Sequence, residues 1–425
     1  MRARTLRLSA ALAVTACLAA PAVVAAHGVA APPVPADPAV VTEWNEIAAR
    51  TIYTENSTPV PASALYFGFV GIAVHDAVAA IDGRYRTYGP LSRPPAVASP
   101  EVAAATAAYR VLRHYFPASA GSLDADYAAF LAGLTADVGR VQGQPVGEQA
   151  AAALIQRRVG DGRGAPVTLD AAPAPGGWRP TPDAFAPMAV PWLGFVTPLG
   201  LRSPTQIPVP GPDPLGSSAY ARDVAEVQAY GAKDSPARTA EQTLTALFWN
   251  ANPVAQYQAA LRDQVSRRGL DIAATARAFA LLGTSTADVL IACWHGKFEH
   301  ATWRPVTAIR LADTDGNAAT RADAEWTPLL PTPPYPEYAS GHACVTGAAS
   351  GTFGSLFGAD ALDLDISSSA TSTTRHYATA AALDAETMDA RIWLGFHFRK
   401  AMTDGNRLGH QVADWTAGHH FGPAR

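Results

Sequence analysis

Apolar residues recur along this chain with the spacing of buried helices. In the first part of the chain the candidate helices are residues 41–53, 61–81, 100–115, 123–141 and 146–159. In the second part they are residues 218–230, 240–250, 254–269, 271–299, 340–357 and 380–396, and we interpret residues 405–418 as a tail. These stretches lack the alternation of polar and apolar residues that is typical of strands. The pattern therefore predicts an all-α protein.

Residues 160–217 interrupt the helical pattern. They contain Asp-Gly-Arg-Gly, Pro-Gly-Gly and Pro-Val-Pro-Gly-Pro-Asp-Pro, which break any regular element. Trp178, Trp192 and Phe195 lie in the same stretch, so we expect it to pack against the helices as a long wrapping connection. We predict two helical bundles: an N-terminal bundle with this connection over residues 32–216, and a C-terminal bundle over residues 217–425.

The first 31 residues have the pattern of a targeting segment. Arg2, Arg4 and Arg7 precede an apolar run over residues 8–26, and small residues suited to cleavage follow. We predict a secretory signal peptide over residues 1–31 and a secreted protein. A lipoprotein signal with Cys17 as the acylated residue is the alternative. No later run is expected to be long and uncharged enough to span a bilayer.

Charge and cysteine content narrow the range of partners. The formal net charge is −4 at pH 7, and no basic tail or basic helix is present. We therefore expect no nucleic-acid partner. Beyond the signal segment only Cys293 and Cys344 remain, and the sequence does not decide between a disulfide and two buried thiols.

Three short motifs between residues 291 and 397 carry the candidate chemistry, and the first contains two cations. Six residues separate Lys297 from Arg304. On a continuous helix the two side chains would share one face, with Pro305 at the helix exit. Lys297 is one of only three lysines among 32 basic residues. In a chain that uses arginine so heavily, a lysine is less expected to be a solvent-exposed residue without a role. Taken alone, however, a solvated helix end explains this pair better than a site does.

The second motif, Ser340-Gly341-His342, opens a helix of small residues. Ser340 suits an N-cap, and the free amides of a helix N-terminus favour an anion. Gly341 lets a ligand approach the backbone closely. His342 is placed to exchange protons with a bound oxyanion, although a locally hydrogen-bonded histidine is an equally good interpretation.

The third motif places Arg391 and His397 on either side of an apolar sequence that contains Gly395. Six residues along an ideal helix leave two side chains about 120° apart, so they share a face only if Gly395 breaks the helix. A histidine in such surroundings is expected to be buried, and buried histidines are more often core residues than ligands. Because the other two motifs also contain cations and a helix N-terminus, we predict that all three form one pocket for a tetrahedral oxyanion.

The three motifs together resemble the signature of the vanadium-dependent haloperoxidases and their relatives, the type 2 phosphatidic-acid phosphatases and bacterial acid phosphatases. The resemblance implies paired four-helix bundles, with the anion in the C-terminal bundle. It implies that His397 coordinates the vanadium of a vanadate cofactor and that His342 is the acid–base residue. The residues implied to bind the oxygens of the anion are Lys297, Arg304, Ser340, Gly341 and Arg391.

The peroxidase branch implies hydrogen peroxide, a halide and a small organic substrate as partners, with Lys297 polarising the peroxide. Trp294 falls where the chlorinating enzymes carry tryptophan. Tyr335 falls where they carry phenylalanine and the brominating enzymes histidine, so the halide preference stays open. Ala339 and Ala390 replace the proline and serine that are usual in the family.

Two other functions remain open at this point. An acid phosphatase would use the same pocket on a phosphate ester, with His397 forming a phosphohistidine. A non-catalytic helical protein with an anion pocket is the third interpretation, and the presence of His342 argues against it.

Several weaker signals lie outside these motifs. Asp288 is a candidate carboxylate partner for a site arginine, and we interpret His75 and Asp76 as a buried polar pair. His295 and His300 are spaced too far apart for a zinc site, and residues 313–317 lack the glutamate of a calcium loop. We interpret the remaining histidines near the end of the chain as solvated, namely His410, His419 and His420.

Overall fold

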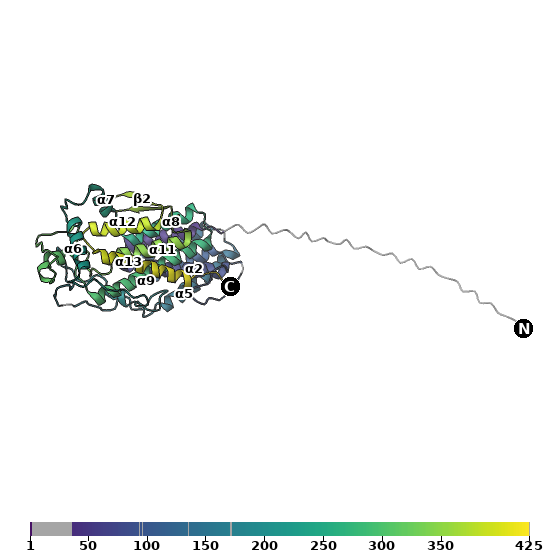
Figure 1. The fold of residues 1–425 in the computed structure, drawn as a ribbon. Helices are drawn as coiled ribbons and strands as arrows, with labels where there is room; N and C mark the ends of the chain where they lie inside the picture. The colour runs from purple at the N-terminus through teal and green to yellow at the C-terminus, as the bar shows by residue number, and fades with distance from the viewer. Residues whose placement is uncertain (2–35, 93, 96, 135, 171, 425) are drawn as a thin grey trace. The chain divides into compact units, whose positions relative to one another are not determined.

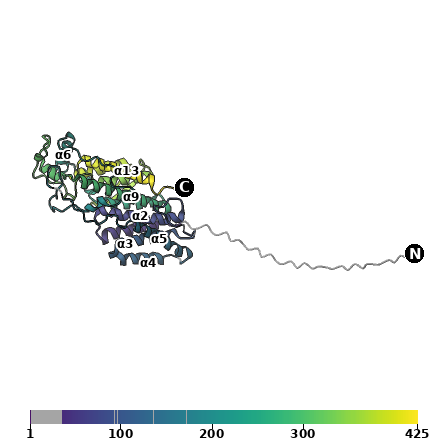
Figure 2. The same ribbon diagram turned by 90° about the horizontal axis from the view of Figure 1, so that it is seen from below.

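Two long apolar helices form the centre of the fold, α2 (Val60–Asp82) and α9 (Ile272–His300). The computed structural model describes Met1 and residues 36–424 except 93, 96, 135 and 171, so the predicted signal peptide with Cys17 lies almost entirely outside the described residues. The two helices touch backbone to backbone, because a Cβ at Gly283 would lie 2.9 Å from the Phe67 carbonyl oxygen. Figure 2 shows them as adjacent layers, with α13 on one side and α3 on the other.

The N-terminal part contributes four more helices to this stack: α1 (Ala39–Ala49), α3 (Pro100–Tyr115), α4 (Ala120–Ala132) and α5 (Val138–Arg157). A π-helical turn over Arg50–Glu55 and a 3₁₀ turn over Pro117–Ser119 complete it. The predicted boundary between the last two helices is wrong. α4 ends at Ala132, and α5 begins at Val138, where the Asp137 carboxylate accepts the Arg140 amide at 2.9 Å and caps the helix.

The connection over residues 158–217 packs against the helices, as predicted, and has one 3₁₀ turn, Pro191–Phe195, among its described residues. Trp178 and Leu193 are buried. The Asp288 carboxylate on α9 accepts the backbone amides of Leu199, Gly200 and Leu201 at 2.6–2.7 Å. The prediction that Asp288 partners a site arginine is therefore wrong, because this carboxylate binds the connection to α9 instead.

The C-terminal part places one small hairpin among seven further helices. The helices are α6 (Ser218–Tyr230), α7 (Ala240–Phe248), α8 (Pro253–Arg267), α10 (Pro305–Arg310), α11 (Gly341–Phe357), α12 (Ala380–Trp393) and α13 (Arg399–His419). A short 3₁₀ turn, Ala312–Thr314, follows α10. The hairpin pairs β1 (Leu364–Ser368) with β2 (Thr373–Tyr377) in antiparallel register, Leu364 opposite Tyr377. The described residues thus confirm an all-α class.

The predicted tail over residues 405–418 is wrong, since it belongs to the 21-residue helix α13. This helix packs along α11, which also lies beside α12 (Figure 1). Small residues make the contact: a Cβ at Gly347 would overlap the backbone oxygen of Asn406, and one at Gly409 would overlap that of Cys344. The contact depends on the absence of side chains at these two glycines.

Among the described residues, α2 and α9 are long and apolar enough to cross a membrane, contrary to the expectation from the sequence. Their most apolar stretches are 83% and 94% buried inside the protein, which is typical of core helices. Residues Ala36–Arg425 make one compact unit. The division into bundles at residues 216 and 217 stays a prediction.

Candidate functional site

A turn, rather than a shared helix face, brings Lys297 and Arg304 together. α9 ends at His300, and Ala301 follows in the left-handed conformation with φ of 40°. Arg304 is extended, and Pro305 is the first residue of α10 rather than a helix exit. The predicted shared face is therefore wrong, but the two cations do lie together, since both are completely buried and both stand against the Tyr335 ring.

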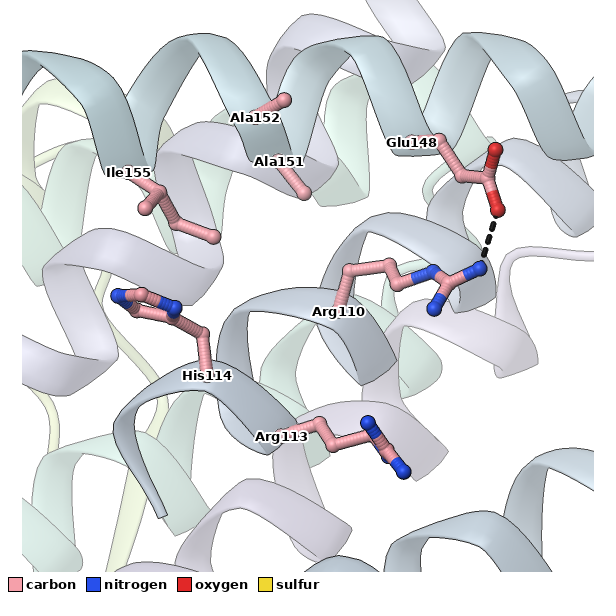
Figure 3. Close-up of a pocket in the computed structure, with 7 residues that line it drawn as sticks. All are labelled: Arg110, Arg113, His114, Glu148, Ala151, Ala152 and Ile155. Carbon is pink, nitrogen blue, oxygen red and sulfur yellow. Dashed lines mark hydrogen bonds and ion pairs between the residues drawn. The ribbon is translucent and has the colours of Figure 1, made fainter. Parts of the chain in front are cut away.

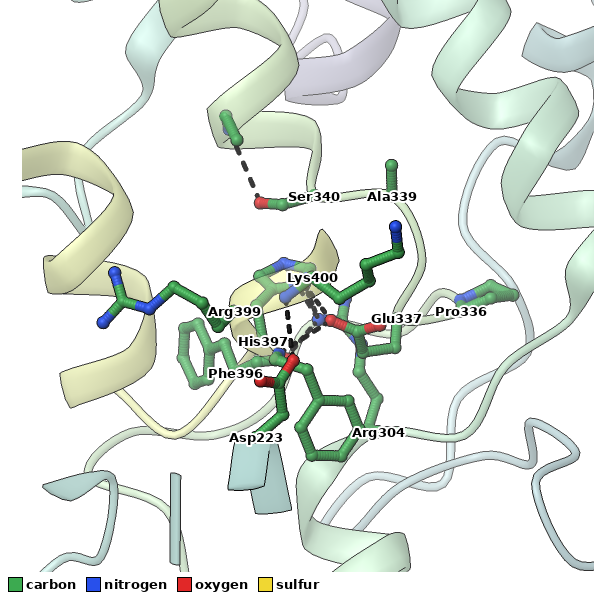
Figure 4. Close-up of polar contacts among 12 residues, drawn as sticks. Asp223, Arg304, Pro336, Glu337, Ala339, Ser340, Phe396, His397, Arg399 and Lys400 are labelled. Atoms are coloured by element: carbon green, nitrogen blue, oxygen red, sulfur yellow. Dashed lines mark hydrogen bonds and ion pairs between the residues drawn. The ribbon is translucent and has the colours of Figure 1, made fainter. Parts of the chain in front are cut away.

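Backbone carbonyl oxygens hold both of these cations. Lys297 Nζ donates to the carbonyl oxygens of Pro336 at 2.7 Å and Glu337 at 3.0 Å. Arg304 donates from Nε to the Tyr335 carbonyl at 2.7 Å and from Nη1 to the backbone at residue 396 at 2.8 Å. Figure 4 shows Arg304 beside this segment. Carbonyl dipoles orient the two side chains without neutralising their charge.

Arg391 is the third buried cation of the pocket, and its Nη1 donates to the Trp249 carbonyl at 3.0 Å. Two guanidinium nitrogens, Arg304 Nη2 and Arg391 Nε, are buried without a hydrogen-bond partner among the described residues. Burial, together with the nearby Arg304 charge, lowers the pKa of Arg391 to about 9 and that of Lys297 to about 8. A bound anion would supply both the missing acceptors and the missing counter-charge.

Ser340, Gly341 and His342 form the N-terminus of α11 as predicted. The Ser340 hydroxyl accepts the Ala343 amide and caps the helix. A Cβ at Gly341 would lie 3.1 Å from the Trp294 ring, so glycine lets this ring pack closely against the start of α11. The pocket therefore adds a helix N-terminus to its three cations, and both features attract anions.

His342 is neutral in the folded protein and has a defined proton position. Burial and the Arg391 charge hold the pKa of His342 well below its usual value. Its Nε2 lies 3.3 Å from the Ala251 carbonyl oxygen, which can only accept a hydrogen bond. Nε2 therefore carries the proton, and Nδ1 keeps a lone pair that can take a proton from a ligand.

His397 reaches the site because the chain leaves the axis of α12 at Gly395. That helix ends at Trp393, and Gly395 has φ of 78°. The helix is therefore broken at Gly395, as the sequence required if Arg391 and His397 were to share a face. The His397 ring is 1% exposed. Its Nε2 lies 3.1 Å from Arg304 Nη1, and its Nδ1 lies 3.0 Å from a carboxylate oxygen of Glu337 (Figure 4).

Sequence reasoning missed Glu337. The residue is completely buried, and its carboxylate contacts the histidine at the centre of the site. The signal that could have identified it is a charged residue between Pro336 and Tyr338, in an apolar turn three residues before Ser340. Burial raises the pKa of Glu337 to about 7, and Lys297 and Arg304 oppose that rise.

Trp294 and Tyr335 cover one side of the cationic cluster. Their ring centroids are 5.0 Å apart. Lys297 Nζ lies 5.6 Å from the Trp294 ring centroid and 5.1 Å from that of Tyr335, and Arg304 Cζ lies 4.8 Å from the latter. The aromatic faces stabilise the cations while excluding water from them.

A cavity of about 270 Å³ lies beside this cluster, and Arg391, His342 and Gly341 line it, whereas Lys297, Arg304 and His397 are not part of its wall. Polar and apolar residues share its wall, among them Trp294, Tyr335, Gly341, His342, Arg391, Leu290, Val345, Asn250 and Val60. The larger cavity between α3 and α5 in Figure 3, of about 600 Å³, also contains arginines. There, however, Arg110 is paired with Glu148 and Arg113 with Asp124, so no free charge is left for an anion.

The structure corrects three minor interpretations. His75 and Asp76 are buried but do not pair with each other: His75 Nε2 contacts the Arg86 carbonyl at 3.0 Å, and Asp76 accepts the amide of residue 88 at 2.6 Å. His410 is not simply solvated, since its Nε2 lies 2.7 Å from Asp384 Oδ2. His420 Nε2 contacts a backbone oxygen at 2.9 Å.

The two cysteines and the other histidines lie near the site without joining it. Cys293 and Cys344 are free thiols, both buried. His295 Nδ1 contacts the Gly194 carbonyl at 3.1 Å, and the His300 ring lies edge-on to Tyr338 at 5.4 Å. These contacts account for both histidines as packing residues at the end of α9.

The buried cations, the helix N-terminus and the two histidines of this bundle form an arrangement whose chemistry suits an oxyanion. Residues 277–422 match the family model of the VCPO second helical-bundle domain, and this part of the chain contains all three motifs. The resemblance predicted from the three motifs is therefore confirmed for this domain. No curated protein matches the chain significantly in sequence.

Solved structures extend the likeness to most of the chain. One is described as the first bacterial vanadium-dependent iodoperoxidase, with a TM-score of 0.79 and 21% identity over 92% of this chain and 99% of that one. A bacterial vanadium-dependent chloroperoxidase matches in its holo form with a TM-score of 0.66 and in its apo form with 0.68. Both forms are 19% identical over 84% of this chain, and cover 91% and 92% of the chloroperoxidase chain. The chain thus has the fold of the bacterial vanadium haloperoxidases.

Proposed function

We propose that this protein is a vanadate-dependent haloperoxidase, which uses hydrogen peroxide to oxidise a halide. The observation that carries the proposal is the excess of buried positive charge around His397. Lys297, Arg304 and Arg391 are oriented by carbonyl oxygens, and two of their guanidinium nitrogens lack partners among the described residues. The shared fold with vanadium-dependent iodo- and chloroperoxidases supports vanadate as the anion.

The donor set suits vanadate. His397 Nε2 would bind the vanadium, and Lys297, Arg304 and Arg391 would bind the oxygens, with the Ser340 hydroxyl and the Gly341 amide completing the set. Vanadate, when bound, supplies a Lewis-acidic centre that activates hydrogen peroxide towards a halide. The protein contributes fixed charges and donors that need no rearrangement during the reaction.

His342 moves the proton in this proposal. Its Nδ1 lone pair accepts a proton from hydrogen peroxide that enters the cavity, and it returns the proton to the oxygen that leaves as water. The lowered pKa keeps the ring neutral and ready to act as a base. Lys297 would polarise the peroxide, because two carbonyl oxygens orient its ammonium group and leave its charge uncancelled.

The halide and the organic acceptor approach from the cavity. Trp294 and Tyr335 lie next to the cations and would border the halide. The apolar wall, with Val60, Leu290 and Val345, suits a small organic molecule. We further propose that the protein is exported, which rests on the signal-like sequence of residues 1–31.

A paired assay tests the proposal. Protein stripped of metal is supplied with orthovanadate, and peroxide-dependent bromination of a dye is measured beside hydrolysis of an aryl phosphate. We expect bromination that requires vanadate, is lost in His397→Ala and persists in His419→Ala, whose histidine is exposed. Phosphate hydrolysis in the stripped protein that vanadate inhibits would instead establish the phosphatase. Silence in both assays would contradict the proposed chemistry.

A further inference from the structure

Glu337 is a buried carboxylate that contacts the histidine of the site. Its Oε1 lies 3.0 Å from His397 Nδ1 (Figure 4). The same oxygen lies 2.9 Å from the Phe398 backbone nitrogen. The two donors come from consecutive residues and converge on one oxygen. The position of the carboxylate relative to the imidazole ring is therefore fixed by both the side chain and the backbone of the same segment.

The neighbours of His397 determine which ring nitrogen carries the proton. Glu337 Oε1 lies 3.0 Å from Nδ1 and already accepts the Phe398 backbone N–H, so it accepts a hydrogen bond from Nδ1 as well. Nδ1 therefore carries a proton. Arg304 Nη1 lies 3.1 Å from Nε2 and 3.5 Å from Nδ1, so its charge stands beside the ring and disfavours a second proton on Nε2. The Glu337 carboxylate is the acceptor that this Nδ1 proton requires.

We propose that Glu337 is a positioning residue that keeps His397 in the Nδ1–H tautomer and thereby presents the Nε2 lone pair to the oxyanion. Histidines that bind metals generally donate their other ring N–H to a carboxylate or carbonyl oxygen, which fixes the ring and makes it a better ligand. The inference rests on the proposed function for the identity of the anion. The tautomer itself follows from contacts between residues of this chain.

The side chain and the backbone of Glu337 have separate partners. The side chain holds His397, whereas the backbone carbonyl oxygen accepts Lys297 Nζ at 3.0 Å. A substitution of the side chain therefore removes the support of His397 and leaves the Lys297 contact in place. This separation lets a variant test the positioning role without removing a cation from the pocket.

The first test is the tautomer of His397 in protein without vanadate, measured from the ¹⁵N shifts of labelled histidines. We expect Nδ1–H in the natural protein and in Glu337→Gln, whose amide oxygen still accepts the proton. We expect a mixture of tautomers in Glu337→Ala. An Nε2–H ring in the natural protein, or an unchanged ring in Glu337→Ala, would overturn the inference. If Glu337→Ala does not fold, the natural protein and the isosteric Gln variant still decide it.

The second test is vanadate affinity, measured by calorimetry without peroxide or halide. Both Glu337 variants are expected to bind about 10–100-fold more weakly, since the charged acceptor is lost in each. Asp288→Asn is the matched control: it removes another buried carboxylate, one that contacts only backbone amides, and its affinity should stay within about twofold of the natural protein. Affinity of the Glu337 variants equal to that of the control would overturn the inference. If the natural protein binds no vanadate, the proposed function fails, and the tautomer measurement still judges the role of Glu337.

Discussion

Lys297, Arg304 and Arg391 are anchored by backbone carbonyl oxygens, and this choice of partner decides what the pocket can do. A carboxylate partner would cancel each charge, whereas a carbonyl oxygen orients the side chain and leaves the charge available. Glu337 is the buried carboxylate near the cluster, and its hydrogen bonds go to His397 and the backbone of residue 398. The pocket therefore keeps a net positive charge that a multiply charged oxyanion can match.

The affinity for vanadate should depend on pH through one of these cations. Burial lowers the pKa of Lys297 to about 8, so the protein without ligand loses the charge of this lysine as the pH rises through that value. A bound anion favours the protonated form, so binding takes up protons there and the affinity falls with rising pH. Calorimetry between about pH 7 and 9.5 measures the vanadate affinity of the natural protein and of Lys297→Met. After correction for the titration of vanadate itself, the variant should lose part of the pH dependence. An affinity that rises with pH would contradict the assigned charges.

Substitution of His342 should lower the turnover rate without a comparable loss of vanadate affinity. His342→Ala removes the proton acceptor but none of the three cations, so we expect turnover to fall by about 10²–10⁴-fold. Vanadate affinity, measured by equilibrium titration, should change by less than about tenfold. Unchanged turnover would show that His342 is not the acid–base residue.

At the scale of elements, the sequence predicted which residues meet, and it failed on how the chain brings them together. The sequence predicted that the motifs of Lys297, Ser340 and His397 lie together, and the three motifs do meet in the structure. The path between Lys297 and Arg304 was wrong, because the left-handed turn at Ala301 has no sequence signal: alanine is a helix former, and tertiary packing imposes the turn. Glu337 was missed because a tertiary contact, rather than spacing, gives it a role.

The contact between α11 and α13 keeps the N-terminus of α11 in place, and it depends on glycine. Gly347→Ala forces a methyl group into the backbone of residue 406, so we expect a loss of about 1–3 kcal/mol or more in the free energy of unfolding. Gly418→Ala, at an open position of the same helix pair, should be neutral or stabilising by up to about 1 kcal/mol. Urea unfolding of the two variants makes the comparison. Equal stability would mean that the two helices are not in close contact.

At the scale of the whole molecule, residues 36–425 are organised around α2 and α9, and the site occupies the C-terminal end of α9. The all-α class and the packed connection over residues 158–217 followed from the sequence, because apolar periodicity and tryptophans report burial. The attachment of that connection did not follow. A single buried aspartate, Asp288, fixes it through three amides that are far away in sequence.

Loss of this attachment should weaken the whole protein. Asp288→Ala leaves three buried backbone amides without their acceptor, at about 1–3 kcal/mol each, so we expect roughly 3 kcal/mol or more of lost stability. Asp288→Asn keeps one acceptor oxygen and should lose less. Denaturant unfolding measures both values, and limited proteolysis near Gly200 should become faster in Asp288→Ala. A variant as stable as the natural protein would show that the connection is held elsewhere.

The most direct measurement is a crystal structure of the protein soaked with orthovanadate, with the metal located from its anomalous scattering. We predict vanadium bonded to His397 Nε2, with its oxygens against Lys297, Arg304 and Arg391, and the Glu337 carboxylate still on Nδ1. Arg304 would then exchange its contact with Nε2 for one with the anion. Vanadium at any other position, or an empty pocket at saturating vanadate, would contradict the proposed site.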